Sequence, residues 1–342
     1  MSCFNSIRLG ALMLTILAAA PMSTVGAQAA IAYGPELQGF EYPHDLKTFA
    51  FESQGENLHM AYMDIPASGQ ANGHTVTLMH GKNFCGATWE ASIKALSEAG
   101  YRVVVPDQIG FCAASKPAHY QYSFQQLAQN TRALLEFLNV KRTVLVGHST
   151  GGMLATRYAL LYPDQVERLV LVNPIGLEDW KALGVPYRTV DQWYARELQL
   201  SADSVRKYEQ STYYVGRWKP EYQRWVDMLA GLNRGPGHAL VAWNSALIYD
   251  MIFTQPVAYE FGRLKMPTLL AIGTADTTAI GSDIAPAEVK AKIGRYDLLG
   301  KQVASQIPRS TLVEMPGLGH APQIEDPAGF HRALLKWLST PD

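Results

Sequence analysis

Apolar residues form eight short runs along the chain, and between several of these runs apolar positions recur at the three- to four-residue spacing of a helix. Five of the runs are almost continuously apolar, which favours strands of a sheet covered by helices on both faces. The strand-like runs are residues 47–52, 58–65, 75–80, 102–105, 143–147, 168–172, 268–272 and 311–315. Helical periodicity appears at residues 87–99, 123–139, 150–162 and 326–338. Strands that alternate with helices predict an α/β fold with a mostly parallel sheet.

The alternation stops between Pro174 and Lys265. This stretch holds five of the seven tryptophans and eight tyrosines, and it has no clear strand signal. We therefore predict a helical cap insertion at residues 175–264, between core segments at 30–174 and 265–342. The aromatic side chains would pack the insertion's own small core, and as a group we expect them to line an apolar pocket.

The chain begins with a pattern typical of a secretory signal peptide. Arg8 is the only charged residue among the first thirty-five, Leu9–Ala20 is apolar, and Ala27-Gln28-Ala29 offers a cleavage site. An uncleaved membrane anchor is the alternative, but the apolar run is short for a bilayer span. We expect a signal peptide at residues 1–29, a periplasmic or secreted mature protein, and no stable membrane insertion after cleavage.

Charge argues against a polyanionic partner. The formal net charge is −1, and loss of Arg8 with the signal peptide makes it −2. No positive field then exists to attract nucleic acid or a charged membrane, so a small-molecule substrate is the expected partner.

Gly147-His148-Ser149-Thr150-Gly151 joins the strand at 143–147 to the helix at 150–162. Glycines on either side of a serine permit a tight strand-to-helix turn that a Cβ would crowd. Such a turn lifts the Ser149 hydroxyl above the sheet and directs the Thr150 N–H toward a developing oxyanion. We predict that Ser149 is a catalytic nucleophile, against the alternative of a purely structural glycine-rich turn.

His320 is the expected base, because it lies in a Gly- and Pro-bounded loop after the last strand. Asp276 follows the seventh strand and is the expected acid that orients His320 and stabilises its charged form. Asp283 is a rival in the same loop, and Glu178 and Asp179 offer another placement after the sixth strand.

The turn at Ser149 resembles that of α/β-hydrolases, which have their second oxyanion donor directly after the third strand, and this resemblance implies a donor in His80-Gly81-Lys82-Asn83. Gly81 permits a close approach, and the Lys82 N–H is the predicted donor. The side chains of Lys82 and Asn83 would either hydrogen-bond the substrate or hold the loop in place. The sequence favours neither role over the other.

The motifs together resemble those of capped serine α/β-hydrolases, a group that includes bacterial esterases, cofactor-free haloperoxidases and carbon–carbon hydrolases. The resemblance covers nearly everything from about residue 45 onward, and it rests on His80-Gly81, Pro106-Asp107-Gln108-Ile109-Gly110-Phe111, Gly147-His148-Ser149-Thr150-Gly151-Gly152, Gly273-Thr274-Ala275-Asp276 and Gly319-His320-Ala321-Pro322. It implies an eight-stranded α/β-hydrolase fold with an inserted helical cap. Related enzymes with an aspartate nucleophile fit less well, because this chain has Ser149.

The resembling fold also places Cys85 and Cys112 in neighbouring loops, and Cys112 stands where the family usually has glycine. Export would let a disulfide form between them, whereas two buried free thiols are the alternative.

These residues predict a serine hydrolase that cleaves a small to medium, fairly apolar carboxylic ester through an acyl-enzyme. The same residues could act on an amide, thioester, lactone or carbon–carbon bond. A ligand-binding receptor on the same scaffold is a third hypothesis. The expected chemistry needs no cofactor, and no Cys/His spacing indicates a metal site.

Overall fold

An eight-stranded sheet forms the centre of the computed structural model, which describes Met1 and residues 31–341. The strands are β1 (Lys47–Ser53), β2 (Glu56–Ile65), β3 (Thr75–Met79), β4 (Arg102–Pro106), β5 (Thr143–His148), β6 (Val166–Val172), β7 (Thr268–Gly273) and β8 (Ser310–Met315). Their order in the sheet is β1-β2-β4-β3-β5-β6-β7-β8. Strand β2 is antiparallel to β1 and β4, and the other neighbours pair in parallel. The predicted mostly parallel eight-stranded sheet is confirmed.

Helices flank this sheet on both faces. The first three helices are α1 (Glu90–Glu98), α2 (Phe124–Phe137) and α3 (Thr150–Leu161). Four more follow strand β7, namely α8 (Ala287–Lys290), α9 (Tyr296–Ala304), α10 (Pro322–Glu325) and α11 (Pro327–Leu338). Short 3₁₀ turns lie at η1 (Gly86–Trp89), η2 (Pro163–Gln165) and η5 (Phe261–Arg263).

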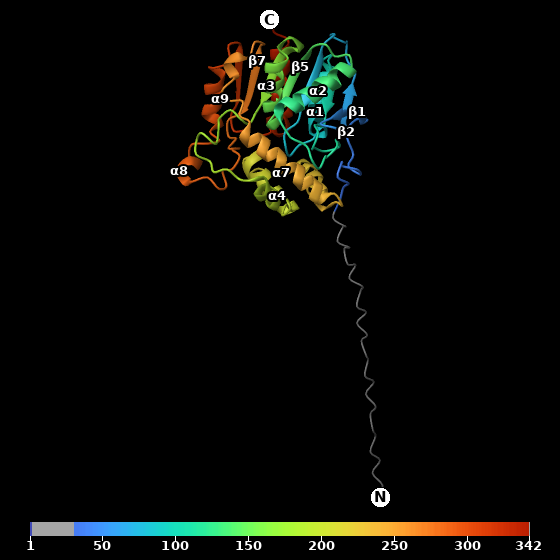
Figure 1. The fold of residues 1–342 in the computed structure, drawn as a ribbon, viewed down its shortest axis with the longest axis vertical. Helices are drawn as coiled ribbons and strands as arrows, with labels where there is room; N and C mark the ends of the chain where they lie inside the picture. Colours follow the sequence, from blue (N-terminus) through green and yellow to red (C-terminus); the bar gives the residue numbers. More distant parts are fainter. Residues whose placement is uncertain (2–30, 342) are drawn as a thin grey trace. The chain divides into compact units, whose positions relative to one another are not determined.

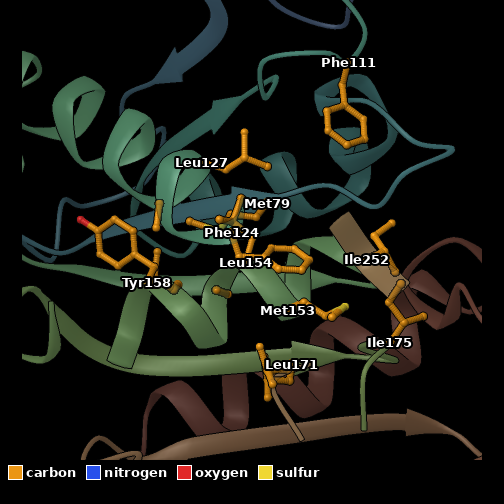
Figure 2. Packing of buried hydrophobic residues seen from close by; sticks show 14 of the residues in the cluster. Met79, Phe111, Phe124, Leu127, Met153, Leu154, Tyr158, Leu171, Ile175 and Ile252 are labelled. Atoms are coloured by element: carbon orange, nitrogen blue, oxygen red, sulfur yellow. The ribbon is translucent and has the colours of Figure 1, made fainter. Parts of the chain in front are cut away.

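Alternation of side chains along each strand divides the core into two layers. In β5, Leu145 packs with residues of α2 and α3, whereas Val144 and Val146 pack with α1 and α11 on the opposite face. Figure 2 shows the first layer, where Phe124 and Leu127 of α2 lie near Leu154 of α3. A buried strand of apolar residues therefore serves both layers at once.

The segment between β6 and β7 is helical, as its composition predicted. It contains α4 (Val190–Glu197), α5 (Ala202–Tyr208), the π-helical turn η3 (Glu209–Tyr213), η4 (Pro220–Tyr222), α6 (Gln223–Arg234) and α7 (His238–Thr254). Helices α4 and α7 pack against each other beside one end of the core (Figure 1). The residues from Ile31 onward nevertheless form one compact unit, so a separate cap domain with the boundaries given above stays a prediction.

The expected signal peptide, apart from Met1, lies outside the described residues. Within the part of the chain that the structure describes, no helix has the length and apolar character required to cross a bilayer.

Candidate active site

Ser149 occupies a sharp turn between β5 and α3. Its backbone has φ 56° and ψ −122°, a conformation that L-residues seldom adopt. A Cβ on Gly147 would lie 2.3 Å from the Gly151 carbonyl oxygen, and one on Gly151 would lie 2.3 Å from the Met79 carbonyl oxygen. The glycines are therefore required by close backbone approach, and the serine is held in a strained position at the end of the sheet.

Three residues from separate loops meet at this turn. The Nε2 atom of His320 lies 2.9 Å from the Oγ of Ser149, and its Nδ1 lies 2.7 Å from Oδ2 of Asp276. All three side chains are buried, with Ser149 the most exposed at 6%. A carboxylate that accepts the Nδ1–H leaves Nε2 free to accept the serine proton, so the three residues can activate a hydroxyl nucleophile.

The rival acids are engaged elsewhere. Asp283 pairs with Arg188 at 2.8 Å, and Glu178 accepts the Gly294 N–H at 2.8 Å. Asp179 accepts a hydrogen bond from a tyrosine hydroxyl on the protein surface. Of the acids considered from the sequence, the structure brings Asp276 to the histidine.

Asn173 supports Asp276 and was missed in the sequence. Its Nδ2 donates to Oδ2 of Asp276 at 3.0 Å, and its Oδ1 accepts the Gly273 N–H at 2.7 Å. The Thr278 N–H donates to the other carboxylate oxygen at 2.8 Å. Asn173 directly follows the buried strand β6, so a polar residue at the carboxyl end of a strand was the available signal.

The loop of His320 is held from two sides. The His320 N–H donates to the Tyr213 carbonyl at 3.0 Å, and the Tyr213 ring stacks on the imidazole at 4.9 Å between centroids. His148 Nε2 donates to the His320 carbonyl at 2.8 Å. Burial holds the pKa of His148 well below its usual value, so this ring stays neutral. His148 thus supports the expected base through its main chain.

The expected oxyanion donors lie on either side of Ser149. A Cβ on Gly81 would come within 2.8 Å of the Ser149 Cβ, so the loop after β3 approaches the serine closely. Among the described residues, the Lys82 N–H has no hydrogen-bond acceptor. Thr150 is the first residue of α3, where a helix leaves its N–H groups unpaired. Both amides are available to an anionic oxygen.

The side chains of Lys82 and Asn83 hold this loop against the inserted helices. Lys82 Nζ lies 3.3 Å from Oε2 of Glu197 and 3.8 Å from the centroid of the Tyr249 ring. Asn83 Nδ2 donates to the Tyr213 hydroxyl at 2.9 Å. Burial lowers the pKa of Lys82, and the adjacent Glu197 carboxylate opposes that shift. Glu197 carried no signal in the sequence, because it is one glutamate on an ordinary helix.

Cys85 and Cys112 are joined by a disulfide, with Cα atoms 5.7 Å apart. Their loops follow β3 and β4, which are neighbours in the sheet. Cys112 has φ 48°, a left-handed conformation that glycine adopts without steric strain. The bond links the loop that carries Lys82 to the loop after β4.

His80, Asp107 and Cys112 are close enough for each to offer one atom to a metal ion. The donor set fits a metal poorly, because the Cys112 sulfur is bonded to Cys85. The Asp107 carboxylate also accepts the Gly86 N–H at 2.7 Å. These groups connect the loops after β3 and β4.

Comparisons with known proteins agree with this architecture. A family model described as the alpha/beta hydrolase fold matches residues 75–327. The crystal structure of a probable hydrolytic enzyme from Pseudomonas aeruginosa PAO1 is 64% identical with a TM-score of 0.90, and covers 91% of this chain and 99% of that one.

Two curated relatives carry names of hydrolases. A Serratia proteamaculans protein named "Putative carbamate hydrolase RutD" is 29% identical over 81% of this chain and 95% of its own length. The 2-hydroxy-6-oxo-2,4-heptadienoate hydrolase of Pseudomonas putida is 29% identical over 46% of this chain and 65% of its own. The family match, the sheet and these relatives lead to one conclusion: the chain belongs to the α/β-hydrolase fold family and is a hydrolytic enzyme.

Proposed function

We propose that this protein is a serine hydrolase that cleaves a small to medium, fairly apolar carboxylic ester through an acyl-enzyme. The observation that carries the proposal is the continuous hydrogen-bonded series from Ser149 through His320 to Asp276. The buried setting strengthens each of these interactions, because water does not compete for them.

Ser149 Oγ attacks the ester carbonyl while His320 Nε2 takes its proton. The N–H groups of Lys82 and Thr150 receive the negative charge that develops on the carbonyl oxygen. His320 then protonates the leaving alcohol as the tetrahedral intermediate collapses to the acyl-enzyme. In the second half, His320 takes a proton from water, the resulting hydroxide attacks the acyl group, and Ser149 recovers its proton.

A cavity beside the Lys82 loop supports the proposed substrate size. It has a volume of about 230 Å³ and is lined by Asn83, by apolar and aromatic residues such as Val205, Leu229 and Tyr249, and by polar residues that include Arg196 and Glu197. The apolar and aromatic part of this wall accommodates an acyl or alcohol chain of a few carbons. We also propose that the protein acts after export, on the strength of its amino-terminal pattern.

A panel of p-nitrophenyl esters with increasing acyl length, run beside fluorophosphonate labelling, tests the proposal. We expect covalent labelling at Ser149 and the highest kcat/KM at short or medium length. The corresponding p-nitrophenyl carbamates, anilides and a lactone provide the comparison with other bonds. If Ser149 is labelled and no ester is cleaved, but a carbamate, an anilide or the lactone is, the protein would be a serine hydrolase of that bond and not an esterase.

A further inference from the structure

A second cavity, of about 420 Å³, lies between the inserted helices and the chain that follows Asp276. Helices α4, α5 and α7 contribute Trp193, Tyr208 and Tyr249 to its wall. The Tyr208 ring lies 5.1 Å from the Tyr213 ring, which stacks on His320. The cavity therefore lies next to the aromatic side chains that pack on His320.

Two cationic side chains at the cavity make no direct ion pair with the described residues. Arg196 of α4 is half-buried, with its guanidinium 5.3 Å from the Trp193 ring and 5.8 Å from the Tyr249 ring. Lys290 of α8 contributes an ammonium group at the exposed edge. Within residues 31–341, neither side chain makes a hydrogen bond or an ion pair, and the carboxylates of Asp283 and Glu197 act on the Arg196 charge only at longer range.

The other charged groups at the cavity are paired with each other or with near neighbours. Asp283 lines the cavity and accepts a hydrogen bond from Arg188 at 2.8 Å. Arg295 also lines it and pairs with Asp297 at 2.6 Å. Arg196 and Lys290 are therefore the cationic side chains at this cavity that have no direct partner among the described residues.

Three buried donors near this cavity lack an acceptor among the described residues. They are Nε1 of Trp193, Oγ1 of Thr278 and Nη1 of Arg188, which packs on the Trp193 ring at 4.4 Å. Indole and guanidinium nitrogens can only donate, and a hydroxyl can donate. A buried donor without a partner is costly, so acceptor oxygens are the chemistry that this region is missing.

We propose that this cavity binds a carboxylate at one end of the substrate, with Arg196 as its main contact. The proposal rests on ester cleavage at Ser149 and narrows the substrate to an ester with an apolar body and an anionic end. The planar guanidinium suits a carboxylate, because it can present two parallel N–H donors. The aromatic side chains Trp193 and Tyr249 provide contact area for the apolar part.

Calorimetry on the full chain with Ser149→Ala tests binding without turnover. Adipate is expected to bind, and adipamide, a neutral molecule of the same length, is expected to bind at least about tenfold more weakly. Adding Arg196→Gln should weaken adipate binding by a similar factor. Arg332→Gln, on the exposed side of α11, is the matched control and should leave adipate binding unchanged. Lys290→Gln changes an exposed residue and should weaken binding severalfold, which keeps the test valid if Arg196→Gln does not fold.

Hydrolysis provides a second measurement. The ratio of kcat/KM for p-nitrophenyl hydrogen adipate to that for p-nitrophenyl hexanoate should exceed one and should fall about tenfold in Arg196→Gln. Cleavage of hexanoate with no adipate preference and no adipate binding would overturn the carboxylate site and leave the proposed function standing. Adipate binding without cleavage of either ester would overturn the proposed function and leave the carboxylate site standing. Inorganic phosphate that binds as tightly as adipate would show a site for free anions and would also overturn the proposal.

Discussion

Lys82 Nζ lies 3.3 Å from Oε2 of Glu197, and this ion pair ties the loop after β3 to helix α4. The Glu197 side chain is 4% exposed and that of Lys82 is 11% exposed, so water screens the pair little. Ser245 of α7 also donates to the Glu197 carboxylate. The position of the Lys82 amide thus depends on how the inserted helices pack.

Replacing Glu197 with glutamine should destabilise the protein and impair turnover. The change leaves a buried ammonium group without its counter-charge, which costs roughly 3 kcal/mol of unfolding free energy in comparable pairs. We expect kcat to fall more than KM rises, because the oxyanion amide acts mainly in the transition state. Urea unfolding and steady-state kinetics measure the two effects. Glu288→Gln, on the exposed surface of α8, is the control, and equal stability of the two variants would contradict the prediction.

Ser149→Ala should abolish ester turnover and fluorophosphonate labelling. Loss of the nucleophile in an enzyme of this type lowers kcat by roughly a millionfold. Thermal unfolding should be nearly unchanged, because the substitution removes one hydroxyl. Intact-protein mass spectrometry checks the labelling, and a label found on another serine would refute the assignment.

His320→Ala should reduce kcat almost as far as Ser149→Ala, because the residues act as a unit. Asp276→Asn should cost somewhat less, on the order of ten-thousandfold, since it disturbs the imidazole tautomer but leaves its position. Glu178→Gln and Asp283→Asn should lower kcat far less than Asp276→Asn. Steady-state kinetics measure these losses. If Glu178→Gln or Asp283→Asn lowered kcat more than Asp276→Asn, Asp276 would not be the orienting acid.

Removing the disulfide should lower the free energy of unfolding. The two cysteines are 27 residues apart, and a closed loop of that length is worth about 3.5 kcal/mol in the chain-entropy account. The suitable variant is Cys85→Ala with Cys112→Gly, because position 112 has a positive φ. Thiol titration of the denatured, unreduced protein should find Cys3 alone, or no thiol once residues 1–29 are removed. Two additional thiols per chain would contradict the bond.

Glu209 should make stability dependent on pH. Burial raises the pKa of this carboxyl from 4.5 to about 8, so it stays neutral in the folded protein where the unfolded chain is ionised. Stability should therefore fall as pH rises from about 4.5 to about 8, by at most about 1.4 kcal/mol per pH unit. Glu209→Gln should flatten this slope, whereas Glu288→Gln should not. Unfolding measured at three pH values in that window checks the prediction, and parallel curves for wild type and Glu209→Gln would refute it.

The sequence by itself determined the strands, their alternation with helices and the turn at Ser149. These features depend on local rules: an apolar run of five residues can be buried in a sheet, and Gly147 and Gly151 allow a turn that other residues would block. The order of Ser149, Asp276 and His320 along the chain was also readable, because each follows a strand and parallel strands end at one edge of the sheet.

Tertiary structure alone decided which side chains surround that turn. Tyr213 and Glu197 reach the site from the inserted helices, more than a hundred residues away from their partners Asn83 and Lys82. Helical periodicity predicts that such helices exist, but it does not say which face meets which loop, because that choice depends on packing between distant segments. The cavity beside Arg196 follows from the same packing, which is why its group of charged side chains could not be recognised in the sequence.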